Sequence, residues 1–304
     1  VRADKPGNAT LRMLARGAAS GDAMELTLPV YERGITRTAG NAMAVTGQGG
    51  NANLELPADA LPGSATMQIS FSPTIAANLS RAIAKLVDFP YGCVEQTLSR
   101  FIPAVHAQAL LTKRSWQPDS ATAAKLPLTI SEGLKRLEEM QHEDGGWGWW
   151  KNDSTTLTMT AHAVYGLGLA KRAGVAVPEG MLKNGIKSLQ QQINTAQTNK
   201  LAQASRALAV NGVSSKPVDA RIAAAWKTLP RGEQIAFAEA LGFSGQKNTL
   251  RPLLDELKRE VQSEGSTAFI RDRDADSWWY GWRWGSSVIE TTSGLLSLLS
   301  REQP

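Results

Sequence analysis

Alternation of apolar and polar positions dominates the first part of the chain. Apolar side chains occupy every second position from Met24 to Val30 and again from Met67 to Phe71, which is typical of strands with one buried face. Turn-rich stretches lie between these segments, at 47–53 and 61–64. Residues 1–72 are therefore predicted to form short antiparallel strands, as in a β-sandwich or a part of one.

From Ser72 onward the apolar period changes to three or four residues, which is the period of helices. Ile75, Leu79 and Ile83 form the first such stripe, behind a Ser72-Pro73 start signal. Glycine and proline residues divide the remainder into separate segments. Further helices are predicted near 94–113, 131–142, 157–172, 180–195, 200–210, 218–229, 233–242, 249–262 and 287–301.

A weak internal repeat relates two of the predicted helices. Residues 160–167 resemble residues 291–298, and each copy follows a tryptophan-rich loop. Helix pairs that close into an α/α toroid would place such loops at one end of the barrel, although a helical solenoid would give a similar pattern. The first loop contains Trp147, Trp149 and Trp150, and the second contains Trp278, Trp279, Trp282 and Trp284.

Composition removes several classes of function. Apolar residues make up 42% of the 304 residues and charged residues 20%, as in ordinary folded proteins. The formal charge of +5 is spread among acidic residues, so nucleic-acid binding is not indicated. No segment approaches the roughly 20 apolar residues of a membrane span. Because the chain begins at Val1 without an initiator Met, we expect a piece of a longer protein whose export signal lies elsewhere.

The chemistry of the chain centres on its single cysteine, Cys93. One cysteine excludes an internal disulfide and a cysteine-based metal cluster, and the three histidines are too far apart in sequence for a ready metal motif, so no metal and no cofactor are expected. Gln96 follows three positions later, at the start of a predicted helix, so that both side chains lie on one helix face. Attack of the Cys93 thiol on the Gln96 carboxamide, with loss of ammonia, would close an internal thioester.

Such a bond needs structural support, and the flanking residues offer candidates. Gly92 gives the backbone freedom for a tight entry, and the helix N-terminus stabilises a departing thiolate. Aromatic side chains would exclude water, without which a thioester hydrolyses. The alternative for a lone cysteine is a small buried apolar residue. The candidate aromatic residues are Phe89, Tyr91, Trp147, Trp149 and Trp150.

The segment resembles the thioester motif of the alpha-2-macroglobulin and complement family, Tyr-Gly-Cys-x-Glu-Gln. Tyr91, Gly92, Cys93, Glu95 and Gln96 stand at the matching positions. The resemblance extends along the chain, because the family places an α/α-toroid thioester domain within a CUB-like β domain. It implies a mainly α fold, with residues 1–72 as a β-sandwich (CUB-like) segment and residues 73–304 as the thioester domain.

The resemblance also implies a function. The chain would be the covalent-capture region of a bacterial protease inhibitor, acting with other domains of the same chain, and not an enzyme. Complement proteins redirect the thioester to hydroxyls with a downstream histidine; the corresponding stretch here, 194–208, has none, and His162 is assigned a structural role. Lysine amines of attacking proteases are therefore the expected acceptors. The expected location is the periplasm, with membrane attachment through a lipid anchor outside these residues.

Three other functions remain open at this stage. The Gly-Trp loop also resembles the repeats of terpene cyclases and prenyltransferases, and a glycoside-processing toroid would use paired carboxylates. A structural interaction module with no formed thioester is the third possibility. The acidic residues considered for an enzyme are Glu138 and Glu139, predicted to lie on an exposed helix face; Asp144; Glu290; and Asp272, Asp274 and Asp276, predicted to lie in a solvated loop.

Overall fold

The structure, a computed structural model, describes most of the chain and divides it into two units. The described residues are 5–31, 34–40, 45, 47, 49–51, 53–71, 82–87, 90–112, 119–264, 267–272 and 288–302. The first unit is Val1–Gln68 and the second is Ile69–Pro304.

The first unit contains one antiparallel hairpin among its described residues. Strands β1 (Gly7–Arg16) and β2 (Gly21–Val30) pair along their whole length, so that Leu11 faces Leu26. The predicted strand at 24–30 is confirmed. The predicted strand at 67–71 is wrong, because these residues form no regular strand and their apolar side chains are exposed. The described part of this unit therefore shows one two-stranded layer and not a complete sandwich.

The second unit is mainly helical, as predicted. A helical stretch at 82–86 is followed by helices whose bounds lie close to those predicted from periodicity, while the earlier predicted helical positions Ile75 and Leu79 lie outside the described residues. The helices are α2 (Val94–Thr112), α3 (Ser120–Glu139), α4 (Leu157–Arg172), α5 (Glu179–Gln192), α6 (Leu201–Val210), α7 (Lys216–Ala225), α8 (Arg231–Phe243), α9 (Lys247–Arg259) and α10 (Val288–Glu302), with short 3-10 turns η1 (Thr198–Lys200) and η2 (Trp226–Thr228).

Two elements differ from the prediction in this unit. Helix α3 begins at Ser120 rather than near 131, because Asp119 caps it by accepting the Thr122 N–H (2.9 Å) and the helix continues through Pro127. A small hairpin of β3 (Gln262–Glu264) and β4 (Thr267–Phe269) follows α9 and was not predicted. Its strands are too short for a visible period of two.

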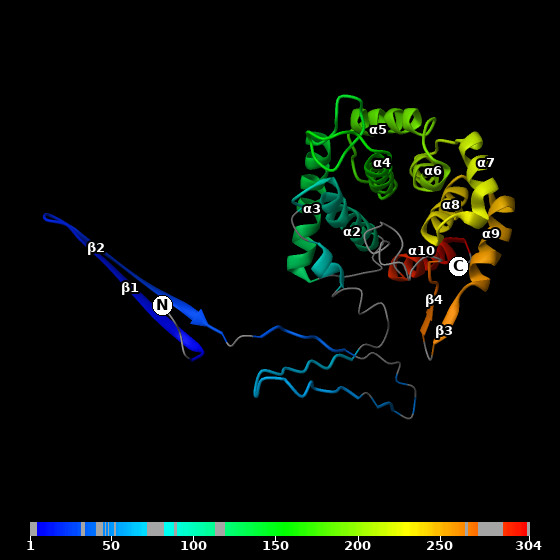
Figure 1. The fold of residues 1–304 in the computed structure, drawn as a ribbon. Helices are drawn as coiled ribbons and strands as arrows, with labels where there is room; N and C mark the ends of the chain where they lie inside the picture. Colours follow the sequence, from blue (N-terminus) through cyan, green and yellow to red (C-terminus); the bar gives the residue numbers. More distant parts are fainter. Residues whose placement is uncertain are drawn as a thin grey trace. The chain divides into compact units, whose positions relative to one another are not determined.

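The helices form two layers that curve around a common centre (Figure 1). Helices α2, α4, α6, α8 and α10 pack side by side in the inner layer, and α3, α5, α7 and α9 each cover the inner helix that precedes them. The sequence explains this division. Helix α8 buries nine of its thirteen residues, whereas α9 buries only Leu250, Leu254 and Leu257, and a helix that is apolar on most sides belongs inside.

Close packing joins the layers where small residues meet large ones. Gly133 of α3 lies against Phe101 of α2, and a Cβ at Gly133 would be 2.7 Å from the Phe101 ring. Trp147, in the loop before α4, is fully buried and lies equally close to Gly185 of α5. These contacts fix the end of the helical unit that carries the cysteine.

Candidate functional site: the Cys93 to Gln96 turn

Cys93 immediately precedes the first residue of α2 and is buried, with 6% of its surface exposed. Gly92 before it has a φ of +88°, a conformation that side chains other than glycine rarely adopt. The chain therefore turns sharply at Gly92 and places Cys93 at the N-terminus of an inner helix. The first backbone N–H groups of the helix carry a partial positive charge there.

Gln96 folds back over this turn. The backbone N–H of Cys93 donates to the Gln96 side-chain carbonyl oxygen Oε1 (3.1 Å). This contact resembles one half of a capping box, in which the side chain at the third helical position accepts the N–H of the residue before the helix. A Cβ on Gly92 would collide with Gln96 Oε1. Gly92 is thus required both for the φ angle and for the space that the Gln96 side chain occupies.

Backbone contacts tie the first turn of α2 to the tryptophan-rich loop. Thr97 donates its backbone N–H and its hydroxyl to the Cys93 carbonyl, each at 2.9 Å. The N–H of Val94, the residue after the cysteine, donates to the carbonyl of Trp149 (2.9 Å). The loop and the cysteine therefore meet, although 56 positions separate Cys93 from Trp149 in the sequence.

Arg136 of α3 supports the same turn and was not singled out from the sequence. Its Nη2 donates to the Gly92 carbonyl (2.7 Å), and its Nε lies 3.5 Å from the Thr97 hydroxyl. The guanidinium fork thus holds the peptide that enters the motif. One charged residue on an amphipathic helix carries no periodic signal, so a single sequence could not have revealed this role.

The remaining motif residues lie on the outside of the turn. Tyr91 is 56% exposed, and the Arg100 guanidinium lies 6.0 Å from its ring centre. Glu95 accepts a hydrogen bond from the Ser99 hydroxyl (2.6 Å), one turn further along α2. Phe89 lies outside the described residues.

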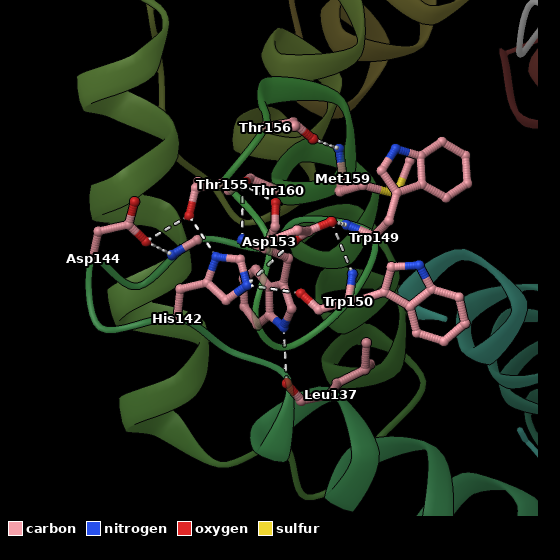
Figure 2. Close-up of polar contacts among 12 residues, drawn as sticks. Leu137, His142, Asp144, Trp149, Trp150, Asp153, Thr155, Thr156, Met159 and Thr160 are labelled. Carbon is pink, nitrogen blue, oxygen red and sulfur yellow. Dashed lines mark hydrogen bonds and ion pairs between the residues drawn. The ribbon is translucent and has the colours of Figure 1, made fainter. Parts of the chain in front are cut away.

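The three tryptophans of the first loop differ in environment. Trp147 is fully buried, and its indole N–H donates to the Leu137 carbonyl (2.8 Å), so it belongs to the core. Trp149 and Trp150 are 41% and 57% exposed, and their indoles project outward from the loop (Figure 2). The second tryptophan-rich loop, with Trp278, Trp279, Trp282 and Trp284, lies outside the described residues.

A buried charged network crosses the inner helices and was not predicted. Arg206 of α6 pairs with Glu239 of α8 (2.9 Å) and lies 4.0 Å from the ring centre of Tyr165 on α4. Arg301 of α10 also pairs with Glu239 (3.3 Å). The network links four inner helices around the carboxylate of Glu239, which is buried.

Two further ionisable groups of the inner helices have shifted pKa values. Burial, with a smaller contribution from Arg206, lowers the pKa of His162 to about 4, so the ring is neutral near pH 7. Burial raises the pKa of Glu233 to about 6, against the opposing effects of Gln203 and Arg206.

The acidic residues considered for an enzyme do not converge on one site among the described residues. Glu138 and Glu139 are exposed at the end of α3, as predicted, and Glu290 is exposed in the first turn of α10. The prediction of a solvated loop is wrong for Asp272, which is buried and accepts the Arg231 N–H (3.0 Å). Asp274 and Asp276 lie outside the described residues.

Neither a metal site nor a membrane span is seen in the part of the chain that the structure describes. These residues contain no group of three His, Cys, Asp or Glu side chains placed to hold a metal ion. None of the helices described is both long and apolar enough to cross a membrane.

A two-layered ring of helices with a Gly-Cys-x-x-Gln turn at the start of an inner helix defines a thioester-type domain. The family model described as the A-macroglobulin TED domain matches residues 65–209, which include this turn. Over these residues the chain therefore matches an A-macroglobulin TED domain, the thioester domain of the alpha-2-macroglobulin family.

Bacterial proteins of this family are similar to the chain in sequence and in fold. Alpha-2-macroglobulin of Thermotoga maritima is 33% identical over 179 residues, 59% of this chain and 11% of that protein. The Escherichia coli K12 protein is 31% identical over 140 residues, 44% of this chain and 8% of that protein. The matched region therefore spans about a tenth of the length of these relatives.

Solved structures support the fold. A mutant Salmonella alpha-2-macroglobulin matches 75% of this chain and 15% of its own, with a TM-score of 0.55 and 22% identity. Salmonella alpha-2-macroglobulin reacted with methylamine matches 74% of this chain and 16% of its own, with a TM-score of 0.51 and 22% identity.

Proposed function

We propose that Cys93 and Gln96 form an internal thioester, and that the chain is the covalent-capture region of a bacterial alpha-2-macroglobulin-like protease inhibitor. One observation carries this proposal: the Gln96 side chain folds back onto the Cys93 backbone, in space that only the absence of a Cβ at Gly92 leaves free.

The chemistry consists of two acyl transfers. In the first, the Cys93 sulfur attacks the Gln96 carboxamide carbon; the S–C bond forms, the C–N bond breaks, and ammonia leaves. In the second, a lysine amine attacks the same carbon and forms an amide, and Cys93 leaves as a thiolate that takes up the proton released by the amine. The helix N-terminus favours that thiolate. Each site reacts once, so the protein is a stoichiometric reagent and not a catalyst.

The partners of this reaction follow from the family. Attacking proteases are the proposed targets, captured through their lysine amines, and other domains of the same chain would release the bond on cleavage. No histidine stands between 194 and 208 to redirect the acyl group to hydroxyls. We place the protein in the periplasm, attached to the membrane by a lipid outside these residues. Trp149, Trp150 and Tyr91 are proposed to shield the bond from water.

The N-terminal hairpin is proposed to be part of a CUB-like β domain. The strand register places Leu11 and Met13 on one face with Leu26 and Met24, while the Arg12–Glu25 pair (3.0 Å) occupies the other. A sheet with one apolar and one polar face is half of a packed layer structure, so a second sheet is expected to cover the apolar face.

The intact mass of the native protein tests the thioester directly. We expect a mass lower than the sequence mass by one ammonia, together with a blocked Cys93. Methylamine should then add its own mass at Gln96 and release one thiol at Cys93, and peptide mapping should find both changes in the same molecules. Cys93→Ala and Gln96→Ala proteins should incorporate no amine while keeping their helical circular dichroism. Amine incorporation into Cys93→Ala would refute the assignment.

Covalent capture is tested with the full-length protein and a protease. A fraction of the protease should remain attached after denaturation and reduction, through an amide between a protease lysine and Gln96. Attachment should disappear in Cys93→Ala and after methylamine treatment. A trap that retains protease equally well in those two controls would act by enclosure alone.

A further inference from the structure

The loop between α3 and α4 contacts the Cys93 to Gln96 turn, and this contact has no part in the proposed acyl transfers. The Trp149 carbonyl accepts the N–H of Val94, the residue bonded to Cys93. Any movement of Trp149 therefore reaches the first turn of α2 directly. The residues that fix Trp149 lie in the same loop, and they include two ionisable side chains, Asp153 and His142 (Figure 2).

Asp153 holds the backbone of both exposed tryptophans. Its Oδ2 accepts the N–H of Trp149 (2.8 Å) and the N–H of Trp150 (3.1 Å). Gly148 leaves space for this carboxylate, because a Cβ there would collide with Asp153 Oδ1. A carboxylate that accepts two adjacent N–H groups fixes the peptide between them, and hydrogen bonds to charged groups are stronger than neutral ones.

His142 holds the same segment from the other side. Its Nε2 lies 3.0 Å from the Trp150 carbonyl and 3.6 Å from Asp153 Oδ1, and both of these are acceptors. Its Nδ1 lies 2.8 Å from the Thr155 hydroxyl, which donates its own proton to Asp144 Oδ1 (2.9 Å). Each ring nitrogen therefore contacts an oxygen atom of the same loop.

We propose that Asp153 and His142 are positioning residues for the Cys93–Gln96 thioester: they fix the Trp149 backbone, which in turn holds the Val94 N–H and keeps the two indoles in place. This inference rests on the proposed function, because without a thioester there is nothing to position. Neither side chain is assigned any part in bond formation.

The consequence is measured as the lifetime of the bond. Hydrolysis adds water across the thioester and leaves a Cys93 thiol and a carboxylate in place of the Gln96 amide. A loosened loop frees the Val94 N–H and lets the indoles move, so water should reach the bond sooner. The fold need not change, because Trp147, the core residue of this loop, keeps its own contact with Leu137.

The experiment compares thiol release in the intact native protein and in Asp153→Ala, Asp153→Asn and His142→Gln. Losing hydrogen bonds to a charged group should shorten the half-life of the bond by about tenfold in Asp153→Ala, with smaller changes in the other two. The matched control is Asp119→Ala, which removes a carboxylate that also accepts a backbone N–H, from Thr122, at the opposite end of α3. In Asp119→Ala the lifetime of the bond should equal that in the wild type, even where the melting temperature falls as much as in Asp153→Ala.

A second variant acts on the other partner of the same contact. Val94→Pro removes the donor N–H, and proline is tolerated at the first position of a helix. It should shorten the bond lifetime by itself, and the Val94→Pro/Asp153→Ala double variant should release thiol no faster than the faster single variant, because both act through one contact. If Asp153→Ala folds poorly, the Val94→Pro single variant still tests the contact, because it leaves Asp153 in place.

The outcomes separate the two proposals. A wild-type protein with full sequence mass and no methylamine adduct would overturn the thioester and this inference with it. A wild type that forms the thioester, while Asp153→Ala and Val94→Pro release thiol at the wild-type rate, would overturn the positioning role alone. Additive effects in the double variant would show that the two residues act separately, and would also contradict the proposal.

Discussion

At the scale of single residues, the site depends on the absence of a Cβ atom at Gly92. Its φ of +88° and the position of Gln96 Oε1 make two separate demands on one residue. The first is conformational and is shared by other glycines of the chain. The second is steric and belongs to the motif, since the Cβ of any other residue would occupy the place of the Gln96 side chain.

Gly92→Ala should therefore abolish the thioester while costing only about 1 to 2 kcal/mol of folding free energy for the left-handed backbone. Gly174→Ala is the matched control, because Gly174 has a similar φ of +83° and an added Cβ there would meet nothing within 4 Å. Mass spectrometry and thermal unfolding of both variants give the answer. If Gly92→Ala retained the ammonia-loss mass, the folded-back position of Gln96 would not be the reactive one.

At the scale of elements, the inner helices are joined by charge as well as by apolar packing. Glu239 of α8 is 4% exposed and pairs with Arg206 of α6 and Arg301 of α10. Removing one member of a buried pair leaves the other charge uncompensated, which costs more than the pair itself contributes.

Glu239→Ala should lower the free energy of unfolding by about 3 kcal/mol, because Arg206 would remain buried without its carboxylate. Asp255→Ala, which removes an exposed carboxylate from α9, should change it by less than about 0.5 kcal/mol. Urea unfolding followed by circular dichroism measures both. Equal, small changes in the two variants would mean that the network contributes little to holding the inner helices together.

At the scale of the whole molecule, stability should depend on pH through His162. Its pKa is lowered from 6.5 to about 4 in the folded protein, so the unfolded chain binds the proton first as the pH falls. The contribution of His162 to the free energy of unfolding is fully present above about pH 6.5 and is lost progressively toward about pH 4.

The free energy of unfolding of the wild type should fall by about 2 to 3 kcal/mol more than that of His162→Gln between about pH 6.5 and pH 4. Taking the difference between the two proteins removes the opposite contribution of Glu233, whose raised pKa is common to both. Denaturant unfolding at several pH values supplies the measurement. Parallel pH profiles of the two proteins would mean that folding does not change the pKa of His162.

The sequence by itself determined the local features of this protein. Helices α4 and α6 were placed to within a residue or so, because a period of three to four apolar residues is written in the chain itself. The closeness of Gln96 to Cys93 was equally visible, since residues three positions apart at a helix start are neighbours. Where local signals conflicted, as at Pro127 within α3, the predicted boundary was wrong.

The tertiary structure alone decided what surrounds the motif. Arg136 contacts Gly92 across 44 positions, and Arg301 contacts Glu239 across 62. The Asp153 and His142 contacts that fix Trp149 are shorter in sequence, but their link to Val94 exists only because α2 and the loop meet in space. Such contacts involve single polar side chains on faces whose apolar pattern is the same with or without them. Periodicity records which face of a helix is buried, and it does not record which residue the buried face meets.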